Sequence, residues 1–278
     1  MSKRLALALA AGLVCTAGAA RADEAILRAN NQVSLWVGGH HLNYHETDTN
    51  NISGLVGPGG QLDSEHGTQA AFGGGLTRQG SLFGLKNVYT SLSLDYSHGN
   101  TDYQGYLVNN TTHTAAPYSS TTRNTTFDVN LKVGPAFALG AQSRAQVVPY
   151  VTYGYHNWVR DLAQPYGDRE TYSHQYLGVG VLGQYSFTPK LVGSADLSVA
   201  RTINPRLTTG STGDFSLGSK AQTSLSVGLD YAVTPRLHAS ASYRATEFKY
   251  GQSPVGVYFE PDSKTIEQRF LVGLGYSF

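Results

Sequence analysis

The feature that most constrains this chain is a strict alternation of apolar and polar residues that recurs along it. The clearest run places Phe127, Val129, Leu131 and Val133 at every second position, with polar or small residues between them. A period of two puts the apolar residues on one face of a β-strand and the others on the opposite face. The pattern recurs in about ten places and predicts strands at 32–45, 68–77, 87–99, 121–139, 145–158, 171–187, 190–203, 217–233, 236–249 and 264–278.

Composition excludes several other classes of protein. Only 14% of the residues are charged, whereas Gly and Tyr are abundant, at 32 and 18 residues. This composition argues against a disordered chain and against a coiled coil. The formal net charge of +1 provides no basic excess for a nucleic-acid partner. After residue 22 no apolar run is long enough for a membrane-spanning helix, but strands can still span a bilayer.

The length of the alternating runs and the chemistry of their second face favour a membrane barrel. Many runs exceed the length usual for strands of soluble proteins and suit a tilted transmembrane strand. The second face carries Gly, Ser, Ala and Thr with occasional single charges. A barrel lumen accepts such residues, whereas a soluble sheet would present Lys and Glu to water. We therefore expect an all-β fold, a transmembrane antiparallel up-and-down β-barrel of about ten strands, with eight or twelve strands as alternatives.

The connections between the expected strands alternate between short and long. Short turns are expected at 140–144, 188–189 and 234–235, and long polar loops at 46–67, 100–120, 159–170, 204–216 and 250–263. Outer-membrane barrels have short periplasmic turns and long outer loops. We therefore expect the long loops outside the cell and both mature termini in the periplasm, which requires an even number of strands.

The first 22 residues have the pattern of a cleaved signal peptide. Lys3 and Arg4 precede an apolar run at 5–14, and Ala20-Arg21-Ala22 forms an A-x-A cleavage motif. The mature barrel domain would then span 23–278. Cleavage removes the single cysteine and three basic residues, so the mature chain has no thiol chemistry and a formal charge of −2.

Aromatic residues concentrate near the ends of the expected strands. Tyr and Trp favour the membrane–water boundary, where one part of the ring is apolar and the other is hydrated. We therefore expect two aromatic girdles. The outer girdle would contain Tyr44, Tyr96, Tyr153, Tyr155 and Trp158, and the inner girdle Phe137, Tyr185, Phe187, Tyr231, Tyr276 and Phe278.

Two segments resemble a known group of proteins. The C-terminal run Val272-Gly273-Leu274-Gly275-Tyr276-Ser277-Phe278 resembles the last strand of bacterial outer-membrane β-barrel proteins, and Val148-Pro149-Tyr150-Val151-Thr152-Tyr153-Gly154-Tyr155 resembles a strand of the small opacity-type, porin-like barrels. The resemblance implies that Tyr276 and Phe278 act as the signal for the barrel-assembly machinery. It also implies the Sec machinery as a partner during export. The group's prototype has eight strands, whereas ten are counted in this chain.

Charged residues on the second face are expected to point into the lumen. Buried charges need partners, and both signs are present, so the simplest interpretation is a structural network. A constriction that selects ions or small solutes is the functional alternative. Arg244 and Glu267 fall at similar heights on neighbouring strands and could pair. The expected lumen-facing set is Asp95, Asp128, Lys132, Asp196, Asp230, Arg244, Glu267 and Arg269.

No motif indicates a metal site, a cofactor or a catalytic centre. Eight histidines, at positions 40, 41, 45, 66, 98, 113, 156 and 174, map to the outer half, where we expect solvated rim residues rather than ligands. His238-Ala239-Ser240 has the His-x-Ser spacing of lipid A deacylases, but it follows a periplasmic turn. The acids and histidines of an omptin-type rim protease could be sought among Asp161, Asp168, Glu170, His156 and His174, although their spacing matches no catalytic constellation.

Three functions stay open on the sequence alone. The first is a porin-like barrel with a narrow passage for small solutes or ions. The second is a non-conducting surface barrel whose long loops at 46–67 and 100–120 mediate adhesion or interaction. The third and least supported is a rim hydrolase, so we expect no enzyme. Outer-membrane lipid and lipopolysaccharide would surround the barrel, which we expect to be a monomer.

Overall fold

The computed structural model describes residues 22–57, 59–109, 114–165 and 167–278. The expected signal peptide lies outside the described residues, apart from Ala22. Among the described residues, no helix is long and apolar enough to cross a membrane. One short helix precedes twelve strands: α1 (Glu24–Ala29), β1 (Gln32–Asp48), β2 (Gly60–Leu82), β3 (Leu85–Asn109), β4 (Thr114–Pro135), β5 (Phe137–Leu139), β6 (Ala145–Leu162), β7 (Arg169–Thr188), β8 (Leu191–Thr209), β9 (Asp214–Ser216), β10 (Gly218–Ala232), β11 (Leu237–Gly251) and β12 (Asp262–Ser277).

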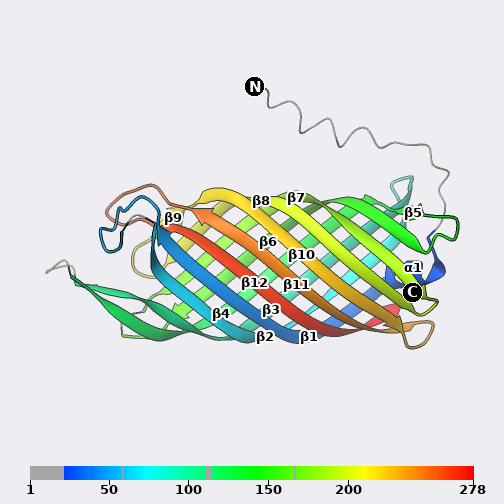
Figure 1. Ribbon diagram of the computed structural model, residues 1–278, viewed down its shortest axis with the longest axis horizontal. Coiled ribbons are helices and arrows are strands. Elements are labelled where there is room, and N and C mark those ends of the chain that lie inside the picture. The colour runs from blue at the N-terminus through cyan, green and yellow to red at the C-terminus, as the bar shows by residue number, and fades with distance from the viewer. Residues whose placement is uncertain (1–21, 58, 110–113, 166) are drawn as a thin grey trace, which may run out of the picture.

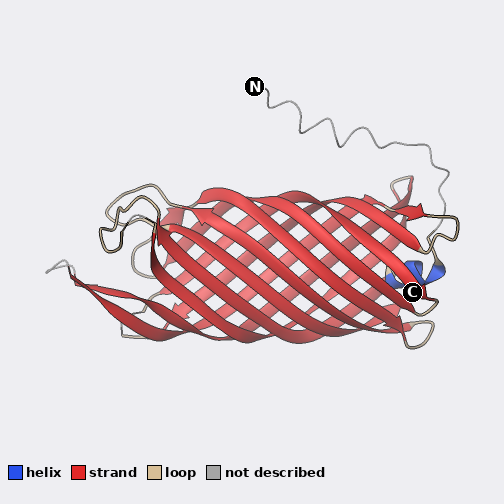
Figure 2. Cartoon of the chain, in the orientation of Figure 1, coloured by secondary structure: helices blue, strands red, loops and turns tan. Residues whose placement is uncertain are grey.

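Ten of these strands form a closed antiparallel barrel (Figures 1 and 2). Each long strand pairs with its neighbours in sequence, and the barrel closes where β12 pairs with β1, from Gln32↔Ser277 to Thr47↔Asp262. The two short strands lie off this ring, since β5 pairs only with β6 and β9 only with β8. The all-β class, the up-and-down topology and the count of ten are therefore as predicted. Closure leaves no sheet edge along the length of the barrel.

The apolar residues of the alternating pattern point away from the lumen. Leu35 and Leu274 are more than 60% exposed, although they stand in the middle of well-ordered pairings. A soluble protein does not expose so much contiguous apolar surface, so this surface is the part that faces lipid. The lipid-facing belt contains Val33, Leu35, Val37, Phe72, Leu76, Leu92, Leu94, Phe127, Leu131, Val151, Tyr153, Tyr155, Leu177, Val179, Val181, Tyr185, Leu197, Val199, Leu225, Val227, Leu229, Tyr231, Tyr243, Phe270, Val272 and Leu274.

The two ends of the barrel differ, and one expectation about them was wrong. The end with the short turns, α1 and the C-terminus is called here the turn end, and the opposite one the loop end (Figure 1). All of 46–67 and 100–120 was expected to be loop, but half of the first range and most of the second belong to β1, β2, β3 and β4, which continue beyond the belt. The β3–β4 pair extends from Val88↔Pro135 to Asn109↔Thr114 and projects past the other strands (Figure 2). Continued backbone pairing, rather than polarity, decides where these strands end.

The expected aromatic girdles are only partly present. Seven of the expected residues lie on the outer surface: Tyr153, Tyr155, Tyr185, Phe187, Tyr231, Tyr276 and Phe278. Tyr44 and Trp158 do not, because both side chains point inward and are fully buried. Each stands at an inward position of its strand, so the alternation, rather than proximity to a strand end, determines which face an aromatic residue occupies.

The sequence pattern did not predict the helix α1 at the turn end. The Asp23 carboxylate accepts a hydrogen bond from the Ala25 amide at 2.9 Å and caps the helix. Ile26 is completely buried, together with Ala25 and Ala29, against Val192 on the inner face of β8. The helix therefore docks in the mouth of the lumen at the turn end (Figure 1).

Candidate functional site

The lumen is the candidate functional site, and β6 shows how it is layered. Every second residue of β6 from Gln146 to Arg160 points inward, and most of these residues are buried. From the turn end to the loop end, the inward residues of β6 include Gln146, Tyr150, His156, Trp158 and Arg160. Gln146 belongs to an amide layer, Tyr150 and His156 to an ionic middle layer, Trp158 to an aromatic layer and Arg160 to an acidic cluster at the loop end.

The layer next to α1 consists of neutral amides. Gln146 donates to Gln184 at 2.7 Å, and Asn30 donates to Gln79 at 2.7 Å and to Gln184 at 2.8 Å. Gln79 in turn donates to Asn87 at 2.8 Å. Asn30 directly follows α1, so this layer ties the helix to β2, β6 and β7. The layer contains no charge that could attract an ion.

All eight predicted lumen residues lie inside the barrel, and most form one ionic network in the middle layer. Arg269 contacts Asp128 at 2.5 Å, Glu267 at 3.0 Å and Asp95 at 3.7 Å. Arg244 pairs with Asp95 at 3.2 Å. The predicted pairing of Arg244 with Glu267 is therefore wrong. The register places Arg244 opposite Arg269 and Thr246 opposite Glu267. Arg244 turns across the lumen to Asp95 on β3, whereas Glu267 pairs with Arg269 of its own strand, β12.

The other three predicted charges also have partners. Lys132 pairs with Asp196 at 2.8 Å, and Asp196 accepts a second hydrogen bond from the Tyr150 hydroxyl at 2.6 Å. Asp230 lies nearer the turn end, where it pairs with His238 and accepts a hydrogen bond from Gln32. Hydrogen bonds from neutral donors thus supplement the ion pairs, as burial of charge requires.

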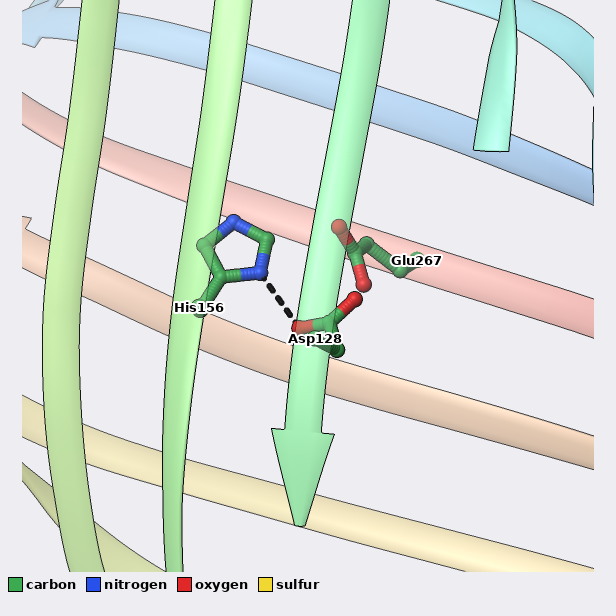
Figure 3. Close-up of side chains that lie close together, drawn as sticks. All are labelled: Asp128, His156 and Glu267. Atoms are coloured by element: carbon green, nitrogen blue, oxygen red, sulfur yellow. Dashed lines mark hydrogen bonds and ion pairs between the residues drawn. The ribbon is translucent and has the colours of Figure 1, made fainter. Parts of the chain in front are cut away.

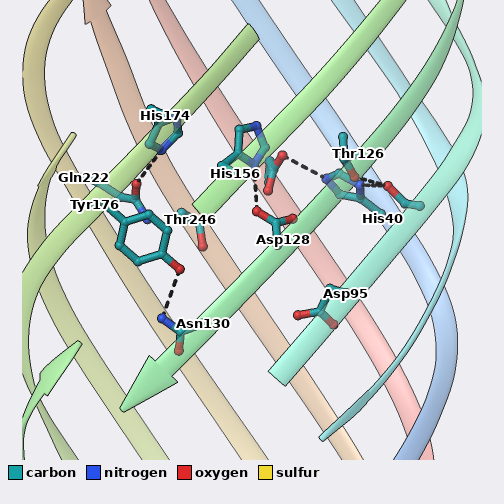
Figure 4. Close-up of polar contacts among 12 residues, drawn as sticks. His40, Asp95, Thr126, Asp128, Asn130, His156, His174, Tyr176, Gln222 and Thr246 are labelled. Carbon is teal, nitrogen blue, oxygen red and sulfur yellow. Dashed lines mark hydrogen bonds and ion pairs between the residues drawn. The ribbon is translucent and has the colours of Figure 1, made fainter. Parts of the chain in front are cut away.

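Three buried histidines belong to this interior, which corrects the expectation of solvated rim residues. His156 bonds Asp128 at 2.7 Å, His40 bonds Ser97 at 2.6 Å, and His174 lies between Tyr250 and Gln222 (Figure 4). The inward parity of positions 40, 156 and 174 was visible in the sequence. The default assumption that a histidine of a barrel is solvated obscured it.

One group in the middle layer has the composition of a metal site. Ligand atoms of Asp128, His156 and Glu267 all lie within 4.8 Å of one another, and the three side chains face each other in Figure 3. The guanidinium of Arg269 already contacts both carboxylates. Its fixed positive charge opposes a second cation at this position, so the chemistry of the group favours an internal ion-pair network.

Little space remains inside the middle layer. The cavity that Asp128, Lys132, His156, Arg244 and Arg269 help to line has a volume of about 50 Å³. That volume has room for only a few water molecules. Side chains therefore nearly fill the lumen at this level.

An aromatic layer separates the ionic network from the loop end. Trp158 stacks on Tyr172 with ring centroids 5.3 Å apart, and Tyr172 stacks on Tyr250 at 5.8 Å. Tyr44 packs edge-on against Trp158 at 5.1 Å. Leu42, Leu207, Leu217 and Phe248 complete this buried cluster. None of these residues was expected in the lumen core.

At the loop end a single arginine is surrounded by acids. The buried Arg160 guanidinium contacts Glu170 at 2.8 Å, Glu65 at 2.9 Å, Asp63 at 3.6 Å and Glu46 at 3.8 Å. Its positive charge also lies over the rings of the aromatic layer, 4.6 Å from the centroid of Tyr44. Because several carboxylates share one cation, this layer carries an excess of negative charge.

That excess changes the titration of acids at the loop end, outside the lipid-facing belt. Burial raises the pKa of Glu170 to about 7, although Arg160 opposes the shift. Burial and the neighbouring carboxylates of Glu46 and Glu170 also raise the pKa of Glu260 well above its usual range. Glu260 lies in the loop between β11 and β12, and the Tyr172 hydroxyl donates to it at 2.6 Å. This bond anchors the loop to the aromatic layer.

The residues considered for a rim hydrolase do not converge. Asp161 pairs with Arg123 on the exposed surface, and Asp168 accepts hydrogen bonds from Ser211 in a neighbouring loop. His156 and His174 lie beside each other in the interior, with ring centroids 5.0 Å apart. They hydrogen-bond to different partners, and neither forms an ion pair or a hydrogen bond with Asp161 or Asp168. Of this set, only Glu170 joins the Arg160 cluster.

Comparison with solved structures identifies the kind of barrel. The outer-membrane protease OmpT from Escherichia coli is 10% identical, with 90% of this chain and 97% of that chain covered and a TM-score of 0.52. The transport unit of the autotransporter AIDA-I from Escherichia coli is 10% identical over 88% of this chain and 90% of that chain, with a TM-score of 0.42. The attachment invasion locus protein Ail of Yersinia pestis is 12% identical over 90% and 99%, with a TM-score of 0.31.

Neither a protein-family model nor a curated protein matches the sequence. At 10% identity, the likeness to OmpT concerns the fold and carries no activity with it. The ring of ten strands, the lipid-facing belt and the polar lumen agree with that likeness. The chain has the fold of the bacterial outer-membrane β-barrel proteins, the group that its C-terminal strand resembles.

Proposed function

We propose that the protein is an outer-membrane surface barrel whose lumen is closed to solutes and ions. In this proposal the turn end faces the periplasm and the loop end faces the outside. Function then lies in the strands that extend beyond the belt. This is the second of the three functions that the sequence left open.

The filled lumen is the observation that carries the proposal. α1 and the amide layer block the turn end, the ionic network fills the middle, and the aromatic layer covers it toward the loop end. A passage for ions needs a continuous hydrated path. A cavity of about 50 Å³ in the middle layer does not provide one. Ten strands enclose a lumen that large side chains can fill completely.

The projecting β3–β4 hairpin is the surface that could act outside the cell. Beyond the last β2–β3 pair, Ser64↔Gln104, β3 continues as part of a two-stranded ribbon with β4. Tyr106 and Val108 expose apolar surface on this ribbon, at 38% and 46%. Exposed apolar side chains on a projecting ribbon are suited to contact with another macromolecule.

A porin-like passage is the second candidate. The specific observation in its favour is the set of charges around the central cavity, which would line a path if α1 and the aromatic layer moved aside. α1 is short and is held largely by the burial of small apolar residues. Release of α1 from this contact would open the turn end.

Single-channel recording separates the two candidates. Refolded 23–278 in a planar bilayer is expected to give no discrete conductance steps, with folding checked by heat-modifiable electrophoresis. Discrete steps whose ion selectivity changes in Arg269→Gln would refute the closed barrel and establish a pore lined by this network. Arg123→Gln is the matched control, because Arg123 lies on the exposed surface at the loop end.

We also infer that the barrel is not an enzyme and that it binds neither metal nor cofactor. Asp161→Asn and His174→Ala are then expected to hydrolyse outer-membrane lipids and peptides no differently from the unmodified protein. Loss of a measurable hydrolytic activity in either variant would contradict this inference.

The proposed route to the membrane follows from the sequence ends. The Sec machinery would export the chain after recognition of the signal peptide, and the barrel-assembly machinery would bind Tyr276 and Phe278. The folded barrel would be a monomer surrounded by phospholipid and lipopolysaccharide.

A further inference from the structure

One part of the lipid-facing belt is hollowed into an apolar groove. The groove lies toward the turn end and crosses β7, β8, β10 and β11, with a cavity volume of about 800 Å³. This volume is within the range of small-molecule sites, roughly 300–1,000 Å³. Tyr185, Phe187 and Phe270 contribute large side chains to its lining, whereas Gly183, Ala195 and Ala241 contribute small ones.

The strand register explains why the groove is there. Gly183 stands directly opposite Ala195, so two adjacent outward positions carry no side chain larger than a methyl group. A Cβ added at Gly183 would meet only the Ala195 carbonyl oxygen, at 3.8 Å, so the space above this glycine is open. On β8 the next outward residues are Leu197 and Val199, and they restore the filled surface of the belt.

The position of the groove identifies an acyl chain as its occupant. The surrounding belt faces the hydrocarbon of the bilayer, and the lining of the groove is almost entirely apolar. Large rings next to small residues form a channel in which an extended hydrocarbon chain gains contacts that a smooth barrel wall does not offer. A second protein is less well suited, because the groove lies within the belt that the acyl chains of the bilayer surround.

A fixed positive charge stands at the turn end beside the groove. The Arg144 guanidinium lies over the Tyr185 ring, 5.6 Å from its centroid. Nε donates to the Ser186 carbonyl at 3.1 Å and Nη2 donates to the Phe187 carbonyl at 2.6 Å. No carboxylate of the described residues forms an ion pair with Arg144. The backbone bonds therefore position a charge that still lacks a counter-ion.

We propose that the groove binds one acyl chain of an anionic glycerophospholipid, and that Arg144 binds its phosphate. An apolar channel that ends at an uncompensated cation matches the two parts of such a lipid. Tyr185 and Phe187 connect the groove to the cation, because both residues line the groove and both contact Arg144. The site does not depend on whether the lumen conducts.

Native mass spectrometry after detergent extraction tests the proposal. The barrel is refolded in vesicles of equal parts phosphatidylglycerol and phosphatidylcholine, extracted, and analysed for retained lipid. We expect one lipid per barrel, with phosphatidylglycerol retained at least fivefold over phosphatidylcholine. Retention of no lipid, or of both lipids in equal amounts, would overturn the proposal.

Two variants separate the groove from the charge. Gly183→Leu fills the groove and is expected to lower lipid retention at least tenfold, whereas Arg144→Gln is expected to remove the preference for phosphatidylglycerol. Ala195→Leu replaces Gly183→Leu if the latter fails to refold, because Ala195 is exposed in the same groove.

Each variant has a matched control outside the groove. Ala70→Leu changes an exposed alanine on β2, and Lys86→Gln removes an exposed charge near the β2–β3 turn. Both should behave as the unmodified protein. Equal loss of lipid in Ala70→Leu and Gly183→Leu would mean that the belt binds lipid without a specific groove, which would refute the site.

Discussion

Replacement of Arg160 by methionine should destabilise the barrel more than any other single charge removal at the loop end. Its guanidinium is 1% exposed and is the shared partner of Glu46, Asp63, Glu65 and Glu170. Methionine preserves much of the side-chain volume but removes the cation, so buried carboxylates lose their counter-charge. Removal of one partner of a buried ion pair costs about 3–5 kcal/mol. We therefore expect a loss of about that size for Arg160→Met.

The assay is reversible urea unfolding of the refolded barrel in lipid vesicles, followed by tryptophan fluorescence. Trp158 lies 5.2 Å from the Arg160 guanidinium, so its emission reports on this layer. The loss should be smaller at pH 5.5 than at pH 8, because protonation of the acids removes the uncompensated charge. A loss caused by packing alone would not depend on pH.

Two further variants make the prediction falsifiable. Adding Glu65→Gln to Arg160→Met should recover part of the lost stability, because one buried charge is then removed. Arg123→Gln breaks an exposed pair with Asp161 and should cost less than about 1 kcal/mol. If Arg160→Met costs no more than Arg123→Gln, the buried cluster does not stabilise the fold and the reasoning fails.

Three other outcomes are expected. The free energy of unfolding of the unmodified barrel should rise by about 1–2 kcal/mol when the pH falls from 8 to 6. The folded-state pKa values of Glu170 and Glu260 are raised, so stability is lost as pH rises through these values. Urea unfolding at each pH measures the change. Trp158→Ala should cost about 3–5 kcal/mol because it opens a cavity in the aromatic layer; its urea unfolding is followed by the emission of the remaining tryptophan, Trp36. Phe278→Ser should change the stability of the purified barrel by less than about 0.5 kcal/mol, because this side chain is exposed. The same variant should lower the amount of barrel assembled in cells, which heat-modifiable electrophoresis of outer membranes measures.

The sequence predicted the barrel because one physical rule governs every strand. Lipid covers one face and the lumen lies on the other, so the alternation that places Leu225 outside also places Ser224 inside. Closure requires only that enough strands pair in sequence, and ten alternating runs met that condition. The inward parity of Asp128 and Arg269 could be read in the same way.

The partners of inward side chains could not be predicted by the same rule. Alternation gives the face and approximate height of a residue but not the direction in which its side chain turns across the lumen. Arg244 and Glu267 have the expected heights, yet Arg244 contacts Asp95 on β3 and Glu267 contacts Arg269 on its own strand. Arg160 stood beyond the expected end of its strand, at 158, so its cluster was not considered. The helix α1 is too short to produce a periodic pattern that a sequence argument could use.

The order of the layers explains how a ten-stranded barrel can hold so many charges without conducting. Four carboxylates and three cations of the middle layer are paired with one another, so the network needs no water channel to stabilise it. The neutral amides on one side and the aromatic rings on the other restrict its access to bulk water. An ion entering from the turn end would first cross the neutral amide layer. A cation that reached the acidic cluster around Arg160 at the loop end would still have to cross the aromatic layer. The charges of this lumen therefore pair with one another and hold the strands together. For this reason, function is to be sought on the outer surface of the barrel.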